Sequence, residues 1–247
     1  MKIVQSHIED KQATYARHPF FDRLRRDAPL HEILPGTEQV AFWTLSFQDA
    51  LRLNEARVED STLRDIVRRH RLEEGGHDHW FLTDMTKIFG SPPDLARLFG
   101  DEHQAAREAG YALLTEVMRA NSDHERLLML FVFESTGHVF FEEIAAYFSR
   151  AGIRRSLKYF AQHHIDAEQD HEVFEKDVAD FIAGIELAPD QRDLARMMVD
   201  RAYVAFHHML DAMEAIAARQ ETPSGVSAGL ALQHRLMLSE QSAAVAA

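Results

Sequence analysis

Apolar residues recur at intervals of three and four along most of the chain, the spacing that places them on one face of an α-helix. Glycine and proline are sparse, and they fall mostly between these periodic stretches. No stretch alternates apolar and polar residues as a half-buried strand would. The pattern predicts an all-α protein with helices at 4–17, 36–57, 61–89, 102–120, 122–150, 154–184 and 188–219.

Local signals and the absence of linkers set the expected domain limits. Asp60 stands at the N-cap position before the stretch 61–89, and Pro189 opens the last long helix. No linker divides the chain, so we expect one helical domain over residues 1–219. Residues 220–247 begin with a turn-rich patch, and we expect them to form a partly helical or frayed C-terminal tail outside the core.

The charge and the residue types narrow the possible partners. The chain has 40 acids and 27 bases, a formal net charge of −13, which argues against nucleic acid or an anionic membrane as the main partner. No stretch has the features of a signal peptide or a membrane span, so we expect a cytoplasmic protein. Because the chain has no cysteine, any metal must be bound by His and carboxylate side chains, a ligand set that suits iron, manganese or zinc.

The stretch HHIDAEQDH, residues 163–171, concentrates potential metal ligands. On a helix, side chains four and seven positions apart share one face, so His164, Glu168 and His171 are expected to point the same way. Taken alone, such a stretch is more simply interpreted as a solvated charged helix. The metal hypothesis therefore depends on the rest of the chain.

A second group of potential ligands lies in RRHRLEEGGHDHW. Glu74 and His77 are three positions apart and can bind one metal ion from a single helix, as in helical di-iron proteins. His70 lies on the same helical face and Glu73 at its border. The Gly-Gly pair before His77 costs a helix interior about 2 kcal/mol relative to two alanines, which indicates a distortion or a close approach at this point.

Glu134 follows seven consecutive apolar residues in the predicted helix 122–150. A helix this apolar is buried on nearly every side, and a buried carboxylate is costly unless a cation or a metal compensates for its charge. An arginine, or His138 one turn later, could provide that compensation without a metal. The sequence leaves both interpretations open.

Together, three predicted helices provide six oxygen and nitrogen donors. This set is neither the thiolate site of a soft metal nor the all-oxygen site of calcium or magnesium, and it fits a pair of irons best. The candidate metal ligands are Glu74, His77, Glu134, His164, Glu168 and His171.

The order and spacing of these residues resemble those of the heme-oxygenase-like diiron oxidases and oxygenases. That family has a Glu and a His on one helix, a lone Glu on a later helix, and then the pattern HxxxD/ExxH. Here His77 precedes Glu134 by 57 residues, Glu134 precedes His164 by 30, and HIDAEQDH supplies HxxxExxH. The segment EEGGHDHWFLTDM is especially similar to the iron-containing redox enzyme branch of the family.

The resemblance implies a heme-oxygenase-like (TenA-like) bundle of about seven helices, in which the six candidate residues bind two irons. Two positions depart from the family's pattern. Glu168 replaces the commoner Asp. The first carboxylate stands at several different distances before the histidine in family members; here Glu74 takes that place, with Glu73 and His70 as the alternatives.

The resemblance also implies an enzyme that uses O2, two iron ions and an electron donor to oxidise a small carboxylate-bearing substrate. Family members include a fatty-acid decarboxylase that makes 1-alkenes and enzymes that convert amino acids to nitriles. The expected chemistry is therefore hydrogen abstraction, N-oxygenation or C–C cleavage in a biosynthetic pathway. We expect an amino acid rather than a fatty acid as the substrate, and a homodimer as the assembly.

Two other hypotheses fit part of the pattern. A ferritin-like diiron carboxylate protein needs a further acid on an earlier helix, where Glu38, Asp49 and Glu55 are the candidates, and it leaves His164 without a role. A metal-free helical binding protein or a thiaminase-like hydrolase on the same fold is the second alternative. Thiaminase chemistry would need a cysteine nucleophile, which the chain lacks.

Overall fold

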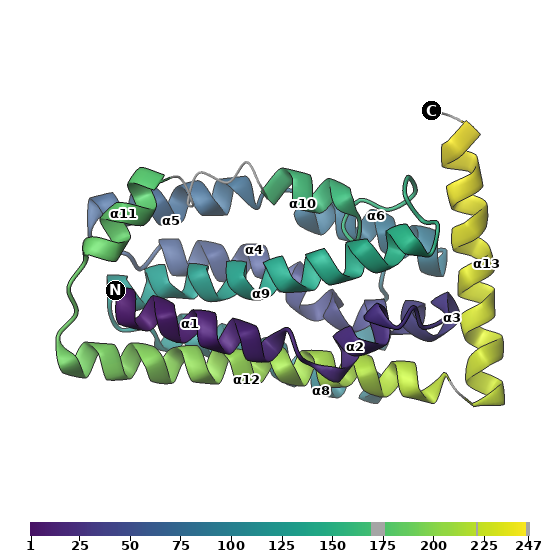
Figure 1. The fold of residues 1–247 in the computed structure, drawn as a ribbon, viewed down its shortest axis with the longest axis horizontal. Coiled ribbons are helices and arrows are strands. Elements are labelled where there is room, and N and C mark those ends of the chain that lie inside the picture. Colours follow the sequence, from purple (N-terminus) through teal and green to yellow (C-terminus); the bar gives the residue numbers. More distant parts are fainter. Residues whose placement is uncertain (169–175, 221, 246–247) are drawn as a thin grey trace.

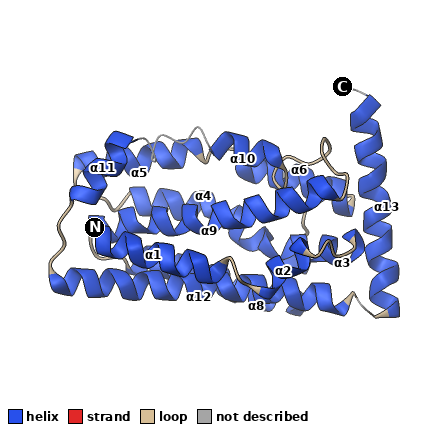
Figure 2. Cartoon of the chain, viewed as in Figure 1, coloured by secondary structure: helices blue, strands red, loops and turns tan. Residues whose placement is uncertain are grey.

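The computed structural model describes residues 1–168, 176–220 and 222–245. The described chain is helical and contains no strand (Figure 2), which confirms the predicted all-α class. None of the described helices combines the length and the apolar character that a membrane crossing requires. The α-helices are α1 (Lys2–Tyr15), α2 (Pro19–Arg25), α3 (Leu30–Ile33), α4 (Ala41–Glu55), α5 (Ser61–Glu73), α6 (His77–Phe89), α7 (Leu95–Leu98), α8 (Gln104–Arg119), α9 (Asp123–Arg150), α10 (Gln162–Glu168), α11 (Lys176–Gly184), α12 (Pro189–Arg219) and α13 (Pro223–Val245), and the 3-10 helices are η1 (Leu34–Val40) and η2 (Asp101–His103).

The long helices α1, α9 and α12 run side by side through the molecule (Figure 1), and α8 packs against both α12 and α4. Helix α9 starts at a capping box, in which Ser122 Oγ accepts from the Glu125 backbone N–H and the Glu125 carboxylate accepts from that of Ser122. Its apolar run from Leu127 to Leu130 is fully buried. The most apolar part of the sequence therefore lies in the core, and Glu134 follows it on the same helix.

The predicted helix 61–89 is two helices in the structure. Helix α5 ends at Glu73 and α6 begins at His77, and between them Gly76 adopts a left-handed φ of +101°. Only glycine adopts this conformation without strain, so the glycine pair marks a turn between two helices. The prediction of one continuous helix is wrong here, although Asp60 caps α5 as predicted by accepting from the Leu63 N–H at 2.9 Å.

The predicted helix 154–184 is also wrong. Residues 151–161 form an irregular loop, and the segment continues as two short helices, α10 and α11. The loop buries Leu157, Tyr159 and Phe160 without forming a helix. Apolar spacing alone therefore predicted the wrong local structure for this segment.

The C-terminal segment packs against the rest of the protein. Helix α13 contacts α3 and α6 and crosses the end of the bundle (Figure 1). Leu236 is fully buried, and Glu240 is buried as well. Residues 223–245 are therefore not a tail outside the core. They form a helix, in agreement with the expected partly helical segment.

Candidate metal centre

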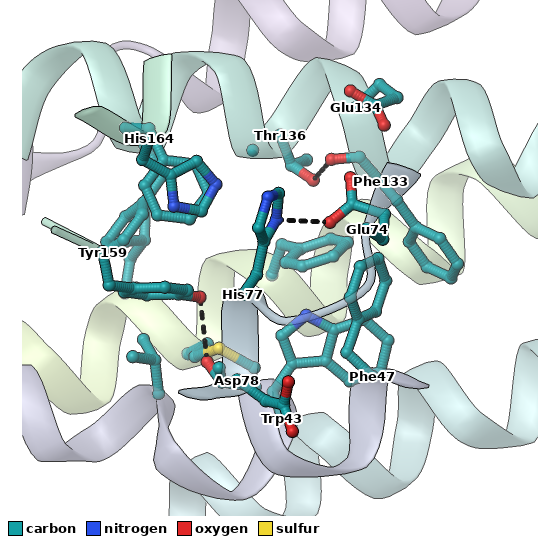
Figure 3. Close-up of a pocket in the computed structure, with 18 of the residues that line it drawn as sticks. Trp43, Phe47, Glu74, His77, Asp78, Phe133, Glu134, Thr136, Tyr159 and His164 are labelled. Carbon is teal, nitrogen blue, oxygen red and sulfur yellow. Dashed lines mark hydrogen bonds and ion pairs between the residues drawn. The ribbon is translucent and has the colours of Figure 1, made fainter. Parts of the chain in front are cut away.

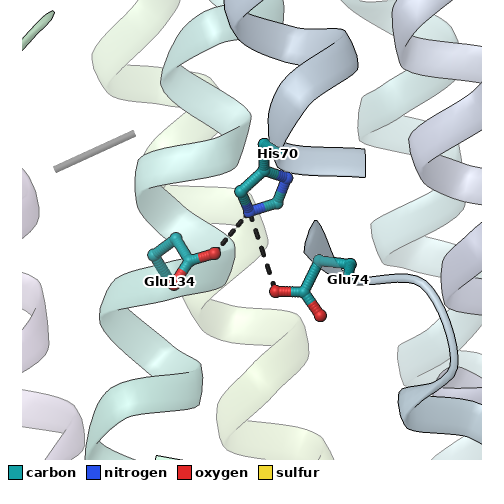
Figure 4. Close-up of side chains that lie close together, drawn as sticks. All are labelled: His70, Glu74 and Glu134. Atoms are coloured by element: carbon teal, nitrogen blue, oxygen red, sulfur yellow. Dashed lines mark hydrogen bonds and ion pairs between the residues drawn. The ribbon is translucent and has the colours of Figure 1, made fainter. Parts of the chain in front are cut away.

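Three side chains from two helical segments meet inside the protein: His70 of α5, Glu74 just after it, and Glu134 of α9 (Figure 4). The His70 Nε2–H group donates a hydrogen bond to Glu134 Oε1, and the same nitrogen lies 3.9 Å from Glu74 Oε1. One candidate ligand atom from each residue lies within 4.8 Å of the other two. The side chain of His70 is 0% exposed, that of Glu74 6% and that of Glu134 10%, so the cluster is nearly dry.

The local sequence explains why these groups meet. His70 and Glu74 are four positions apart, and Glu74 is the C-cap residue of α5, so the end of this helix presents both side chains on one face. Glu134 reaches them from the buried centre of α9, where its charge needs a partner. That partner is His70 and not His138, which is 59% exposed and pairs with Glu142 at 3.3 Å. The buried acid is thus compensated by another potential metal ligand.

The geometry and the donor types of this cluster fit a metal ion. Two ligands on opposite sides of an ion, with bonds of about 2.0–2.2 Å, lie at most about 4.4 Å apart. The cluster's 4.8 Å limit exceeds this by a few tenths of an ångström, which side-chain rotation can close. One imidazole and two carboxylates in a dry site suit iron, manganese or zinc.

Glu74 connects this cluster to a second group of potential ligands (Figure 3). Its Oε2 lies 2.8 Å from His77 Nδ1, while its Oε1 faces His70. The His77 ring in turn lies 4.5 Å from the His164 ring, centroid to centroid. His77 is 5% exposed and His164 1%. The two oxygens of one buried carboxylate therefore face two different histidines.

Ring packing holds His164 in place. Its imidazole stacks on Phe141, with the ring centroids 3.6 Å apart and the planes tilted by 22°. The Tyr159 ring meets it edge-on at 4.9 Å. His164 is the third residue of the short helix α10. Its position therefore also depends on the loop that leads into this helix.

Two buried carboxylates anchor that loop. Asp84 of α6 accepts hydrogen bonds from the Lys158 N–H at 2.9 Å and the Phe160 N–H at 3.2 Å. Glu240 of α13 accepts from three successive N–H groups, those of Arg154, Arg155 and Ser156, at 2.8–3.0 Å. Helices α6 and α13, which are far apart in sequence, thus fix the backbone that leads to His164.

The two anchors differ in their protonation behaviour. Burial raises the pKa of Asp84 to about 6, although the backbone N–H groups of Lys158 and Phe160 oppose the shift. Burial also acts to raise the pKa of Glu240, but its hydrogen bonds to the loop outweigh burial and lower that pKa. Near pH 6, one anchor is therefore partly protonated and the other is fully ionised.

A cavity of about 90 Å³ lies beside the two groups of donors (Figure 3). Helices α4, α6, α9 and α12 contribute to its wall, which is mainly aromatic. In one part of the wall, the hydroxyl groups of Thr44 and Tyr159 are hydrogen-bonded to each other at 3.0 Å. Its aromatic residues include Trp43, Phe47, Phe133, Phe140, Phe141 and Phe206.

The structure describes four of the six residues predicted as ligands around this cavity: Glu74, His77, Glu134 and His164. Glu168 is the last residue of α10, with a side chain outside the described part, and the prediction for His171 falls outside the described residues. Their role as ligands stays a prediction. His70, one of the two alternatives from the sequence, belongs to the cluster of donors. The other alternative, Glu73, is not part of that cluster.

The acids that a ferritin-like site would need lie elsewhere. Glu38 pairs with Arg97 at 3.0 Å, and Glu55 pairs with Arg68 at 2.7 Å. Asp49 is exposed and pairs with a neighbouring arginine on its own helix. None of the three joins the cluster found among the described residues.

Comparison with known proteins gives no family for this chain. No model of a known protein family matches it, and no curated protein matches it either. Its function must therefore be argued from the geometry of the donors and of the cavity beside them.

Proposed function

We propose that the protein is a non-heme diiron oxidase or oxygenase with a heme-oxygenase-like helical fold. The observation that carries the proposal is the position of Glu74, whose two oxygens face different histidines in a buried site beside a mainly aromatic cavity. A carboxylate in this position suits two ions better than one. A single ion would bind the donors on one side of Glu74 and leave the histidine on its other side unused. The expected resemblance to the diiron family points to the same residues.

The donors divide into two sets around Glu74. His70, Glu74 and Glu134 would hold one iron. His77 lies next to the other oxygen of Glu74, and His164 lies beside His77. These two histidines would hold the second iron together with Glu168 and His171. When bound, the irons would supply the reduction of O2, with electrons from an external donor.

The chain's own residues would bind and shield the substrate. Together with a bound substrate, the aromatic wall would exclude water, which would strengthen electrostatic interactions inside the cavity and protect reactive species from side reactions. The Thr44 and Tyr159 hydroxyl groups offer a polar contact in this apolar wall. The cavity would thereby hold the reacting bond of the substrate close to the donors.

The size of the cavity favours a small substrate. The volume of the cavity is about 90 Å³, well below the roughly 300–1,000 Å³ of pockets that hold drug-sized ligands. This difference favours a substrate of the size of an amino acid over a long-chain fatty acid, so an amino acid is the proposed substrate.

Anaerobic loading with Fe(II), followed by metal counting, tests the proposed centre. We expect about two irons per chain in the parent protein. Glu134→Ala should lose most of this iron, because it removes a carboxylate that belongs to the cluster and lines the cavity. Glu142→Ala is the matched control, since Glu142 lies on the same helix but is 57% exposed.

Exposure of the loaded protein to O2 tests the activity. We expect a transient visible absorption band and O2 consumption that increases with the correct amino acid. If Glu134→Ala binds as much iron as the parent, the proposed centre is wrong. Many irons per assembly without substrate-dependent O2 consumption would show an iron-storage protein instead.

A further inference from the structure

We propose that Asp78 binds an ammonium group of the ligand that occupies the cavity. The substrate would then be an amine or an amino acid that presents its ammonium group to Asp78. This inference rests on the proposed function only in assigning the cavity to the substrate.

The first observation is the place of Asp78. It follows His77 in the first turn of α6, it is partly buried, and it lines the cavity. Among the described residues, no hydrogen bond or ion pair holds its carboxylate. A partly buried carboxylate without a partner is costly, and a cationic ligand would remove that cost.

The second observation is the charge of the cavity wall. Its described residues include the carboxylates of Glu74, Asp78 and Glu134, and no lysine or arginine. Glu74 and Glu134 have His70 as a neighbour and would be neutralised further by a bound metal. Asp78 is not part of that cluster. It therefore leaves a negative charge in the wall that metal binding at the cluster does not use.

The third observation is the aromatic surface around the cavity. Trp43 lies 5.3 Å from Phe47 and 5.4 Å from Phe133, and Phe206 lies 5.9 Å from Trp43, between ring centroids. The faces of aromatic rings attract cations, and such walls recognise ammonium groups in proteins. An acid beside aromatic rings thus matches an organic ammonium ion better than a neutral or anionic ligand.

The helix dipole alone does not account for Asp78. An acid in the first turn stabilises the positive N-terminal end of a helix, but it does so equally well when it faces solvent. Here the side chain lines an aromatic cavity. This orientation brings a desolvation cost that helix stabilisation does not require.

The proposal also orients an amino-acid substrate. Its ammonium group would lie at Asp78, so its carboxylate would lie away from that acid. The Thr44 and Tyr159 hydroxyl groups in the same wall offer a polar contact for it. A fatty acid would bring only a carboxylate to a wall that already carries three.

Three probes of similar shape test this assignment: pentylammonium, pentan-1-ol and pentanoate. Their binding to the full-length chain is measured by calorimetry at neutral pH, without metal and with Zn(II). We expect pentylammonium to bind most tightly. Asp78→Asn should weaken pentylammonium by about tenfold and leave pentan-1-ol unchanged, because it removes the charge and keeps the shape. Asp78→Glu should restore part of the loss. Glu142→Gln, an exposed acid on α9, is the control and should change nothing.

Two results would overturn the assignment: equal binding of pentylammonium by Asp78→Asn and the parent, or binding of pentanoate as tight as that of pentylammonium. Iron counting separates this failure from failure of the proposed function. Asp78→Asn should still bind as much iron as the parent, since Asp78 is not part of the donor cluster. If the parent binds no iron but binds pentylammonium more tightly than Asp78→Asn does, the ammonium site stands and the diiron proposal fails.

Discussion

The two halves of the candidate centre are built in different ways. In the first half, His70 and Glu74 come from the end of α5 and meet Glu134 of α9, a helix of 28 residues. In the second half, His164 lies near the start of α10, a helix of seven residues. The first half is positioned by the packing of α5 and α9 and by the hydrogen bond between His70 and Glu134. The second half depends on an irregular loop anchored by carboxylates from two other helices.

This difference shows that the two halves can be weakened separately. The first half has its buried charges paired within the cluster, so its geometry follows from the packing of α5 against α9. In the second half, Asp84 and Glu240 accept hydrogen bonds from the backbone N–H groups of the loop before His164. The position of His164 therefore follows from residues that are not candidate ligands. Changes at the anchors should therefore affect His164 and leave the cluster of His70, Glu74 and Glu134 in place.

The largest expected effect is the pH dependence that Asp84 imposes on the second half. Its pKa is about 6 in the folded protein against an ordinary value of 3.8, so the folded state binds more protons between these values. The free energy of unfolding should therefore fall by about 3 kcal/mol as the pH rises from about 4 to about 6. Above this range it should stay level. Urea unfolding of the parent and of Asp84→Asn across this range measures it. The decline should disappear from the variant, and an identical pH dependence in both proteins would contradict the assignment.

A smaller effect is expected from Glu240→Ala. It removes the acceptor for three backbone N–H groups, of which that of Ser156 is buried, and should lower the free energy of unfolding by about 2 kcal/mol. Iron bound after anaerobic loading should fall from about two per chain to about one, because the first half keeps its donors.

Gln241→Ala, at the exposed position next to Glu240, is the control and should leave both measurements unchanged. Loss of both irons from Glu240→Ala would show that the two halves are not independent.

The smallest effect is expected from Gly76→Ala, which tests the first half. Gly76 has a φ of +101°, and an alanine there should cost about 1 kcal/mol of stability through backbone strain. Gly184→Ala is the matched control, because its added Cβ meets no atom within 4 Å and its φ is not left-handed. The midpoints of urea unfolding compare the two variants. Equal midpoints would mean that the turn between α5 and α6 carries no strain.

The sequence was sufficient for the parts that depend on neighbouring residues. The apolar periodicity marks α9, Asp60 marks the start of α5, and Pro189 marks the start of α12. The spacing of Glu74 and His77 correctly indicated that they lie close together, although they approach across a turn and not along one helix. The glycine pair between them signalled that turn as a distortion, but its φ could not be read from composition.

The parts that depend on distant residues could not be predicted in this way. His70 was visible as a candidate, but its bond to Glu134 joins residues 64 positions apart. The loop at 151–161 has the apolar spacing of a helix, yet its N–H groups are bound by Asp84, which lies 74 positions from Lys158, and by Glu240, 84 positions from Ser156. Such contacts replace helical hydrogen bonds and leave no local signal in the sequence.

The long separation in sequence between Glu240 and the loop that it anchors has a consequence for synthesis. It is made 85 residues after Arg155, whose backbone it anchors. At ordinary rates of translation this interval lasts roughly 4 to 17 s, and during that time the loop before α10 lacks one of its two anchors. His70, Glu74 and Glu134 are all translated before the interval begins. A growing chain therefore holds every donor of the first half well before the second half can be completed, which sets an order of assembly on the ribosome.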